Sequence, residues 1–288
     1  MLLLHAMFLD KKIVQQLCRE YAVTPAKMKG QNFLVDSTVL SRIIQEAELS
    51  SQDSVLEIGP GWGALTLALA EKVKKLVTVE IDSRLASSLQ KLLFSYPHVE
   101  VIHQDILKIS NEKIADFFID REYNIVSNLP YSITSLVLRK FLDTDPKPKE
   151  MTLLMQKEVA ERICGRAGQM SLLALSVQLY AKPRIVMPVS KKSFYPEPEV
   201  DSALVRIEEI ASCRDVEARL GISTKKFFQI ARMGFSSKRK MLGNTLAAGW
   251  QMEKDETKRR LVEADIDPKA RPQQLSLEDW VRLARLVG

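Results

Sequence analysis

The feature that most constrains the fold is a buried strand that runs directly into a glycine-rich turn. Residues Val55 to Gly63 read Val-Leu-Glu-Ile-Gly-Pro-Gly-Trp-Gly, and residues 64–71 have the pattern of a helix. Glycines at such a strand end let the backbone approach a ligand at the carboxyl edge of a parallel sheet. The G-x-G-x-G spacing differs from the G-x-G-x-x-G of dinucleotide sites, so it favours a nucleoside ligand without a pyrophosphate. Taken alone, the motif also fits an ordinary tight turn.

Strand and helix patterns alternate along the first two thirds of the chain. Apolar residues at helical spacing follow Asp36, a typical helix-capping residue, and short apolar runs between the helices predict strands. This alternation predicts an α/β fold, a Rossmann-like doubly wound sheet that is mostly parallel and covered on both faces. The expected strands are 54–58, 76–80, 99–103, 123–127, 151–155, 184–189 and 203–207.

The pattern changes after Glu209, where only helices are expected. Their predicted ranges are 223–234, 239–248, 253–264 and 276–286. Residues 1–20 show no clear pattern and are expected to form a loosely held extension. We therefore predict an N-terminal extension (1–20), an α/β domain (21–208) and a small all-helical domain (209–288).

The positive charge of the chain is concentrated in its last quarter. Residues 225–288 contain 14 Lys and Arg against 8 Asp and Glu, whereas residues 1–224 contain 28 of each sign. A basic module beside a neutral body suggests a polyanionic partner such as nucleic acid, and a solvated helical surface is the alternative. Lys238, Arg239 and Lys240 are adjacent cations at an expected helix start, where they would hold an RNA backbone without reading its sequence.

Composition excludes several classes of protein. Apolar residues make up 46% of the chain and charged residues 27%, which are globular proportions. The apolar opening Met1–Leu9 is too short to span a bilayer and lacks the features of a signal peptide. The three cysteines form no CxxC pair, so we expect neither a disulfide framework nor a metal site. These features favour a reduced, cytoplasmic setting with no membrane partner.

Two acidic residues follow the next two strands. Glu80 ends one strand, where a carboxylate can accept hydrogen bonds from both hydroxyls of a ribose, and Asp105 could accept from an adenine amino group. Each has an ordinary alternative, Glu80 as a solvated strand end and Asp105 as a helix cap. With the glycine turn, however, they predict an S-adenosylmethionine pocket over which residues 31–34 could close.

The segment after another buried strand has the chemistry of an amino-group acceptor site. The oxygen of Asn128 and the carbonyl of Leu129 could each accept one N–H of an exocyclic adenine amine, which turns the nitrogen lone pair toward a methyl donor. Pro130 lacks an N–H and fixes the backbone, and Tyr131 offers a face for stacking. Phe194, in a Pro-rich loop, could cover the other face of the base. Alone, the first segment also fits a turn, and Phe194 fits a core aromatic.

Together these motifs resemble the KsgA/RsmA family of small-subunit ribosomal RNA adenine N6,N6-dimethyltransferases over residues 24–286. The matching segments are Gly30–Leu34, Glu57–Thr66, Val79–Asp82, Asn128–Tyr131, Phe194–Ser202, the basic segment after Phe235, and Asp267–Pro272.

The resemblance implies a methyltransferase that places two methyl groups on N6 of each of two adjacent adenosines. These lie in a 3′-terminal hairpin loop of small-subunit rRNA and are modified during ribosome biogenesis. S-adenosyl-L-methionine would be the methyl donor, no metal is expected, and the chain would act as a monomer without binding DNA. The implied cofactor residues are Asn32, Leu34, Gly59, Gly61, Glu80, Asp105 and Asn128. The implied acceptor residues are Asn128, Leu129, Pro130, Tyr131 and Phe194.

Three departures from the family pattern accompany this resemblance. Gln104 stands where glycine is usual, the loop at 165–170 lacks a Tyr-Gly element, and the basic motif reads Ser-Lys-Arg-Lys. Two other functions remain open from sequence. One is a large-subunit rRNA adenine methylase of the macrolide-resistance type, and the other is a ribosome-assembly factor that keeps the fold with little catalysis.

Overall fold

The computed structural model describes residues 9–23, 31–237 and 239–287, and the chain divides into two compact units. The first unit contains Met1–Phe141, Pro146–Ala160 and Arg184–Glu208. The second contains Leu142–Asp145, Glu161–Pro183 and Glu209–Gly288. Each unit therefore draws on segments that are distant in sequence. The predicted limits of the three regions, 1–20, 21–208 and 209–288, stay predictions.

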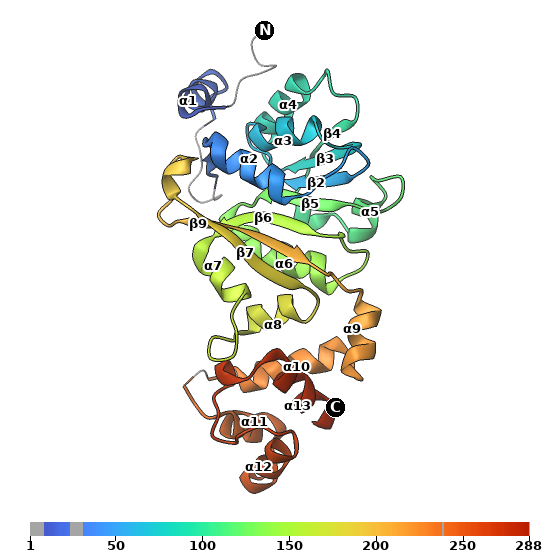
Figure 1. The fold of residues 1–288 in the computed structure, drawn as a ribbon, viewed down its shortest axis with the longest axis vertical. Helices are drawn as coiled ribbons and strands as arrows, with labels where there is room; N and C mark the ends of the chain where they lie inside the picture. The colour runs from blue at the N-terminus through green and yellow to red at the C-terminus, as the bar shows by residue number, and fades with distance from the viewer. Residues whose placement is uncertain (1–8, 24–30, 238, 288) are drawn as a thin grey trace. The chain divides into compact units, whose positions relative to one another are not determined.

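The first unit is built around a seven-stranded sheet with the order β4-β3-β2-β5-β6-β9-β7 (Figure 1). Strands β2 to β6 pair in parallel, and β9 runs antiparallel to β6. The strands are β2 (Ser54–Ile58), β3 (Lys75–Glu80), β4 (Val99–His103), β5 (Asn124–Asn128), β6 (Met151–Gln156), β7 (Lys182–Val189) and β9 (Ser202–Glu208). The chain order reverses on either side of β2, which is where doubly wound sheets place their ligands. The predicted mostly parallel α/β sheet is confirmed.

Helices connect these strands and begin at side chains suited to capping. The carboxylate of Asp36 accepts hydrogen bonds from the backbone N–H groups of Thr38 and Val39 at the start of α2, and Asp82 accepts one from Arg84 at the start of α4. The helices of this part of the chain are α2 (Ser37–Glu46), α3 (Ala64–Ala70), α4 (Ser83–Leu92), α5 (Asn111–Ala115), α6 (Thr134–Asp143) and α7 (Lys157–Ile163). Helices α5 and α7 were not predicted.

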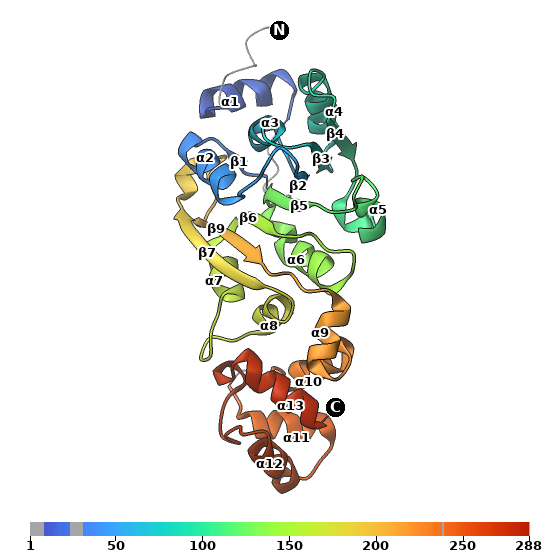
Figure 2. The ribbon, with the colours of Figure 1, turned by 45° about the vertical axis from the view of Figure 1, so that its right-hand side comes forward.

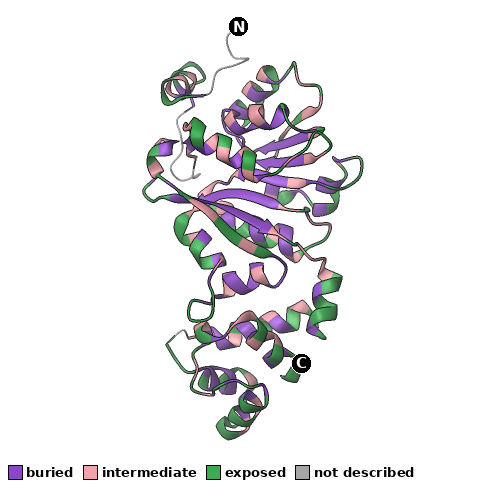
Figure 3. Ribbon diagram, in the orientation of Figure 1, coloured by how far each residue is buried: buried purple, intermediate pink, exposed green. Residues whose placement is uncertain are grey.

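The core of the first unit lies on the central strands, which Figure 3 shows as buried. Val55 and Leu56 of β2 are 0% exposed, as expected for a strand covered on both faces. Apolar side chains of α2 and α3 pack on the same cluster, which includes Ile43 and Leu69. This packing holds the carboxyl ends of β2, β3 and β5 in fixed positions.

An unexpected helix, α1 (Lys11–Glu20), lies where no pattern was recognised. Asp10 caps it, and Val14 and Cys18 are buried on one side. They pack in a cluster with Phe33 and Trp62, so the expectation of a loosely held segment was wrong for the described part, which starts at residue 9. The apolar residues of α1 do recur at helical spacing, but its other positions are strongly polar.

A two-stranded ribbon joins distant parts of the first unit. Strand β1 (Phe33–Leu34) pairs antiparallel with β8 (Phe194–Tyr195). Figure 2 shows β1 beside α2. The hydroxyl of Ser193 donates a 2.8 Å hydrogen bond to the carboxylate of Asp36, which extends the connection. The ribbon fixes the chain that leads into α2 against the Pro-rich loop.

The second unit is helical. Its helices are α8 (Leu172–Gln178), α9 (Cys213–Leu220), α10 (Thr224–Gly234), α11 (Leu242–Trp250), α12 (Lys254–Glu263) and α13 (Leu277–Val287). Trp280 is fully buried and stacks on Phe235 with ring centroids 5.3 Å apart. Helices α10, α12 and α13 match the predicted ones closely, whereas α8 and α9 were not predicted. Helix α11 begins at Leu242, so the expectation that Arg239 and Lys240 lie at a helix start was wrong: they precede the helix. In the described part of the chain, no helix has both the length and the apolar character needed to cross a membrane.

Candidate active site

A pocket of about 310 Å³ opens at the carboxyl ends of β2, β3 and β5. Most of the residues predicted for the cofactor and the acceptor base line it, although they come from five separate segments. These residues are Asn32, Leu34, Gly59, Gly61, Glu80, Asp105, Asn128, Leu129, Pro130 and Tyr131.

The glycine turn brings the main chain to the floor of this pocket. Gly59 and Gly61 have φ values of +68° and +59°, a conformation that side-chain-bearing residues rarely adopt. A Cβ atom on Gly61 would lie 2.8 Å from the Phe33 ring, and one on Gly59 would lie 3.1 Å from Pro130. The turn is therefore packed tightly on both sides, and only glycine leaves its backbone open to a ligand.

Glu80 is 4% exposed and is held by two backbone N–H groups. Its Oε2 accepts a hydrogen bond from Gly61 at 3.2 Å, and its Oε1 accepts one from Asp82 at 2.9 Å. Burial raises the pKa of this carboxyl, while the two N–H donors oppose the rise. The bond to Gly61 joins the acid at the end of β3 to the glycine turn, so both are placed for one ligand.

Asp105 caps a short helix and also lines the pocket, and its contact with adenine stays a prediction. Its Oδ1 accepts a hydrogen bond from the N–H of Leu107 at 3.0 Å and so caps a short helical turn. The same residue lines the pocket beside Gln104 and Ile106. Its capping bond fixes the carboxylate at the rim, where Gln104, the departure from the family pattern, also lies.

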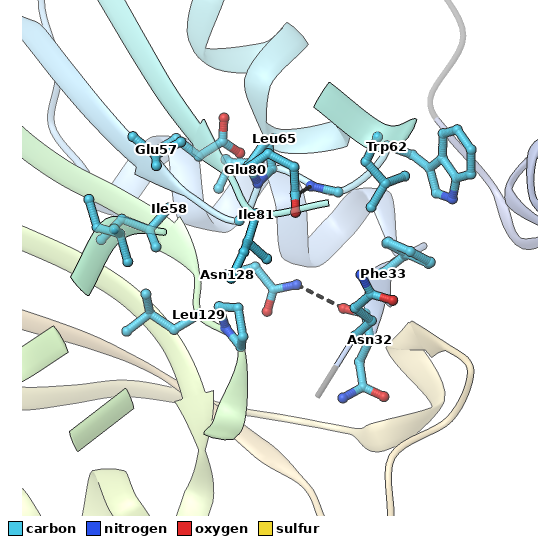
Figure 4. Close-up of a pocket in the computed structure, with 18 of the residues that line it drawn as sticks. Asn32, Phe33, Glu57, Ile58, Trp62, Leu65, Glu80, Ile81, Asn128 and Leu129 are labelled. Atoms are coloured by element: carbon cyan, nitrogen blue, oxygen red, sulfur yellow. Dashed lines mark hydrogen bonds between the residues drawn. The ribbon is translucent and has the colours of Figure 1, made fainter. Parts of the chain in front are cut away.

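Asn128 is oriented by a hydrogen bond across the pocket (Figure 4). Its Nδ2 donates to the backbone carbonyl of Asn32 at 3.0 Å. A carbonyl can only accept, so the amide N–H side of Asn128 faces Asn32, and the opposite atom, Oδ1, is available as an acceptor. An exocyclic amine needs an acceptor of this kind.

The residues after Asn128 are held by neighbouring strands. The backbone N–H of Leu129 donates to Leu154 on β6 at 3.0 Å, and Leu129 is 1% exposed. The hydroxyl of Tyr131 lies 2.6 Å from that of Ser202 on β9, and burial raises the pKa of this phenol. The tyrosine ring is therefore anchored at its far end while it lines the pocket.

Phe194 is the predicted acceptor residue that the structure places elsewhere. It is 2% exposed and packs in the core cluster with Leu34 and Val189. Its pairing with Leu34 in the β1–β8 ribbon turns the ring into the core, so in this structure it offers no free face to a base. Stacking by Phe194 stays a prediction.

Several residues of the pocket were not singled out from the sequence. Leu9 and Val14 reach the pocket from the start of the chain, and Trp62 and Ile81 line it from the turns after β2 and β3. The hydrophobic spacing of α1 was the available indication for Val14. Glu57 was noticed only as part of the glycine motif, although a carboxylate inside a buried strand is itself unusual.

The predicted RNA-binding cations belong to the second unit. Arg239 and Lys240 are exposed, and Lys238 lies outside the described residues. Across 9–23, 31–237 and 239–287, no three His, Cys, Asp or Glu side chains are grouped so that they could hold a metal ion.

The pocket fits the predicted cofactor. The glycine turn, where a Cβ atom would clash, allows a ligand to contact the backbone closely. Glu80 and Asp105 lie at neighbouring strand ends, where they can accept hydrogen bonds from the ribose and the base of a nucleoside. The buried carboxyl of Glu57, whose Oε2 completes no hydrogen bond to any described residue, lies in the same lining and suits a ligand that carries positive charge.

Two proteins with similar sequences share one name. A Dehalococcoides mccartyi (strain CBDB1) protein named "Ribosomal RNA small subunit methyltransferase A" is 42% identical over 93% of this chain and 90% of its own length. A Bacillus pumilus (strain SAFR-032) protein of the same name is 36% identical over 95% of this chain and 94% of its own.

Solved structures with the same fold include a dimethyladenosine transferase from Plasmodium falciparum. It matches with a TM-score of 0.72 and 28% identity over 87% of this chain and 95% of its own. The 23S rRNA methyltransferase ErmE matches with a TM-score of 0.68 and 27% identity over 89% and 100%. The family model "Ribosomal RNA adenine dimethylase" matches residues 25–287. The predicted KsgA/RsmA resemblance is therefore confirmed: the chain belongs to the ribosomal RNA adenine dimethylase family.

Proposed function

We propose that this protein transfers methyl groups from S-adenosylmethionine to N6 of two adjacent adenosines in a 3′-terminal hairpin loop of small-subunit rRNA, late in subunit biogenesis. The observation that carries the proposal is the orientation of Asn128 in the pocket. Its Nδ2 is engaged by the Asn32 carbonyl at 3.0 Å, which leaves Oδ1 as the acceptor beside the glycine turn. The names of the similar proteins support the small subunit as substrate.

The chain's own residues would prepare the adenine amine for attack. Oδ1 of Asn128 and the carbonyl of Leu129 each accept one N6–H, so the nitrogen lone pair is freed from the ring and directed toward the donor. Pro130, with φ of −58°, holds the backbone at this point. The ring of Tyr131, anchored at its hydroxyl, supports the base after it has left its stack.

S-adenosylmethionine, when bound, supplies an electrophilic methyl group on a sulfonium centre. The glycine turn and Asp105 would hold its nucleoside, and Glu80 would accept from the ribose. Leu34 and Ile58 exclude water from one side of the pocket. Catalysis then rests on positioning and on a dry, preorganised site, because the donor is already activated.

The expected partners and setting follow from the same proposal. Arg239 and Lys240 would contact the phosphate backbone of the rRNA, together with Lys238. We infer a monomer that acts in the cytoplasm on a ribosomal subunit or its precursor and needs no metal ion. The likeness to ErmE makes large-subunit rRNA the second candidate substrate.

The test is methyl transfer from labelled S-adenosylmethionine to isolated small subunits that lack the modification. Large subunits and duplex DNA serve as parallel substrates, and mass spectrometry locates the product. Dimethyladenosine at two adjacent positions in small-subunit rRNA alone is the expected result. Label in large-subunit rRNA would favour the second candidate. Tight binding of small subunits and cofactor without any transfer would indicate an assembly factor.

A further inference from the structure

Glu57 is a buried carboxyl group in the wall of the cofactor pocket. It lies on β2, two residues before Gly59, and is 1% exposed. Among the described residues, its Oε2 completes no hydrogen bond, and the hydroxyls of Thr66 and Thr78 complete none either. The hydroxyls of Thr66 and Thr78 nevertheless lie close enough to Glu57 to lower its pKa as donors, so its nearest polar neighbours are neutral groups held in imperfect geometry.

The register of the sheet places Glu57 on the same face as Glu80. Glu57 is directly opposite Thr78 on β3, and Glu80 is two residues further along that strand. Opposite residues of parallel strands, and residues two apart on one strand, point to the same side of a sheet. The side chains of Glu57 and Glu80 therefore lie on the same face of the sheet, and both residues, labelled in Figure 4, line the pocket.

The groups around Glu57 leave its charge uncompensated. Thr66 on α3 and Thr78 on β3 are neutral, Glu80 adds negative charge, and strand β5 carries no charged side chain. Burial, assisted by Glu80, raises the pKa of Glu57 to about 8, and the two threonine hydroxyls oppose the rise. Burial also raises the pKa of Glu80, which has two N–H donors and the neighbouring carboxylate of Asp82. Full burial beside a second carboxyl group therefore favours the neutral form of Glu57.

We propose that Glu57 is a positioning residue that responds to cofactor charge: it is neutral in the empty pocket and releases its proton to solvent when S-adenosylmethionine binds. The methyl donor carries a sulfonium charge that its product, S-adenosylhomocysteine, lacks. A newly ionised Glu57 therefore stabilises the donor more than the product. This inference rests on the proposed function, which supplies the cofactor.

The proposal fixes the direction of a pH effect. A bound cation lowers the pKa of a neighbouring carboxyl, and a ligand that lowers a pKa binds more tightly as pH rises. The preference for S-adenosylmethionine over S-adenosylhomocysteine should therefore grow between about pH 6 and pH 8. If the bound donor lowers the pKa of Glu57 by one, the preference measured above both pKa values is about ten times larger than the preference at low pH.

Titration calorimetry of the full chain measures the proton directly. Binding enthalpies at pH 7 in two buffers of different ionisation enthalpy give the number of protons released for each cofactor. We expect wild type to release more protons with S-adenosylmethionine than with S-adenosylhomocysteine. Glu57→Gln, which keeps the shape of the side chain, should lose most of this release, and its preference between the two ligands should change little with pH.

Two variants keep the test decisive. Glu100→Gln makes the same change at an exposed position of β4 and should behave as wild type. Thr66→Val removes a hydroxyl that lowers the pKa of Glu57. The rise in the preference for S-adenosylmethionine should therefore occur at higher pH, while proton release persists. This variant provides the test if Glu57→Gln fails to fold.

Two outcomes separate this inference from the proposed function. Wild type that binds S-adenosylmethionine without net proton release, or a folded Glu57→Gln with unchanged release, would overturn the inference and leave the function standing. Wild type that binds neither cofactor would remove the proposed function instead.

Discussion

At the scale of single residues, the orientation of one amide decides what the acceptor site can do. Asn128 uses its N–H side to hold the carbonyl of Asn32, and so its oxygen is the atom left for the substrate. The segment that carries Asn32, predicted to contact the cofactor, thus also orients the amide of the proposed base site.

Replacement of Asn128 by alanine tests this role. The change removes the proposed acceptor of one N6–H, so we expect methyl transfer to fall by at least about 100-fold, the scale measured when one oxyanion-hole donor is removed. The cations predicted to bind RNA lie elsewhere in the chain, so RNA binding should change little. Rates with saturating cofactor and RNA affinity by filter binding check the two expectations. Unchanged turnover would remove Asn128 from the acceptor site.

Replacement of Glu80 by alanine tests the cofactor side. The change removes the proposed acceptor for the ribose hydroxyls and also the hydrogen bonds that Glu80 accepts from Gly61 of the glycine turn and from Asp82. We expect S-adenosylmethionine to bind about 1–3 kcal/mol more weakly, the usual scale for charge-assisted hydrogen bonds. Calorimetry measures the loss, and Glu100→Ala is the matched control on β4. Equal affinity in wild type and Glu80→Ala would refute the assignment.

The residues predicted from sequence share one property. Gly59, Glu80, Asp105 and Asn128 each end or follow a strand, and the carboxyl ends of parallel strands must meet at one edge of the sheet. Their convergence could therefore be predicted without coordinates. The exposure of Phe194 could not, because it depends on how the ribbon turns the ring against Leu34.

At the scale of elements, α1 shows why an amphipathic helix can be missed. It carries many polar residues, yet Val14 is 1% exposed and lines the cofactor pocket. Its apolar side is buried by packing with Phe33 and Trp62, which come later in the chain. Local periodicity predicted helices such as α10 and α12, whereas the helical character of α1 becomes clear only from its tertiary packing.

A charge on the buried side of α1 should therefore affect both stability and cofactor binding. Val14→Asp places a carboxylate in the apolar cluster, and we expect a loss of more than about 2 kcal/mol in the free energy of unfolding. Cofactor affinity should fall as well, because Val14 is part of the pocket wall. Urea titration and calorimetry measure the two losses. Lys12→Asp, on the exposed side of α1, should change neither, and equal effects of both variants would argue against the packed helix.

At the scale of the whole molecule, charge separates the two ends of the chain. The net charge of +6 resides in residues 225–288, and Arg239 and Lys240 are exposed there. The distribution of charge could be predicted from the sequence, but the individual cations that contact RNA could not. An interaction with phosphate leaves no pattern in the sequence beyond the charge itself.

Neutralising the three adjacent cations tests the predicted RNA surface. Changing Lys238, Arg239 and Lys240 to glutamine should weaken RNA binding, because fewer counterions are released. The slope of log K against log salt should fall by about 0.7–0.9 for each phosphate that the protein no longer neutralises. Cofactor affinity should stay as in wild type. An unaltered salt slope would show that these cations do not touch the phosphates.

The β1–β8 ribbon also determines when, during translation, the pocket wall can form. Residues 33 and 34 leave the translating ribosome early, but they pair with residues 194 and 195, which are made much later. The hydrogen bond between Asp36 and the hydroxyl of Ser193 likewise cannot form until Ser193 has been made. A nascent chain that already holds the glycine turn and Asn128 thus still has an unfinished cofactor wall. The pairing can form only when about two thirds of the 288 residues have been made, so a product that ends before residue 194 should lack a complete cofactor wall however well its early strands fold.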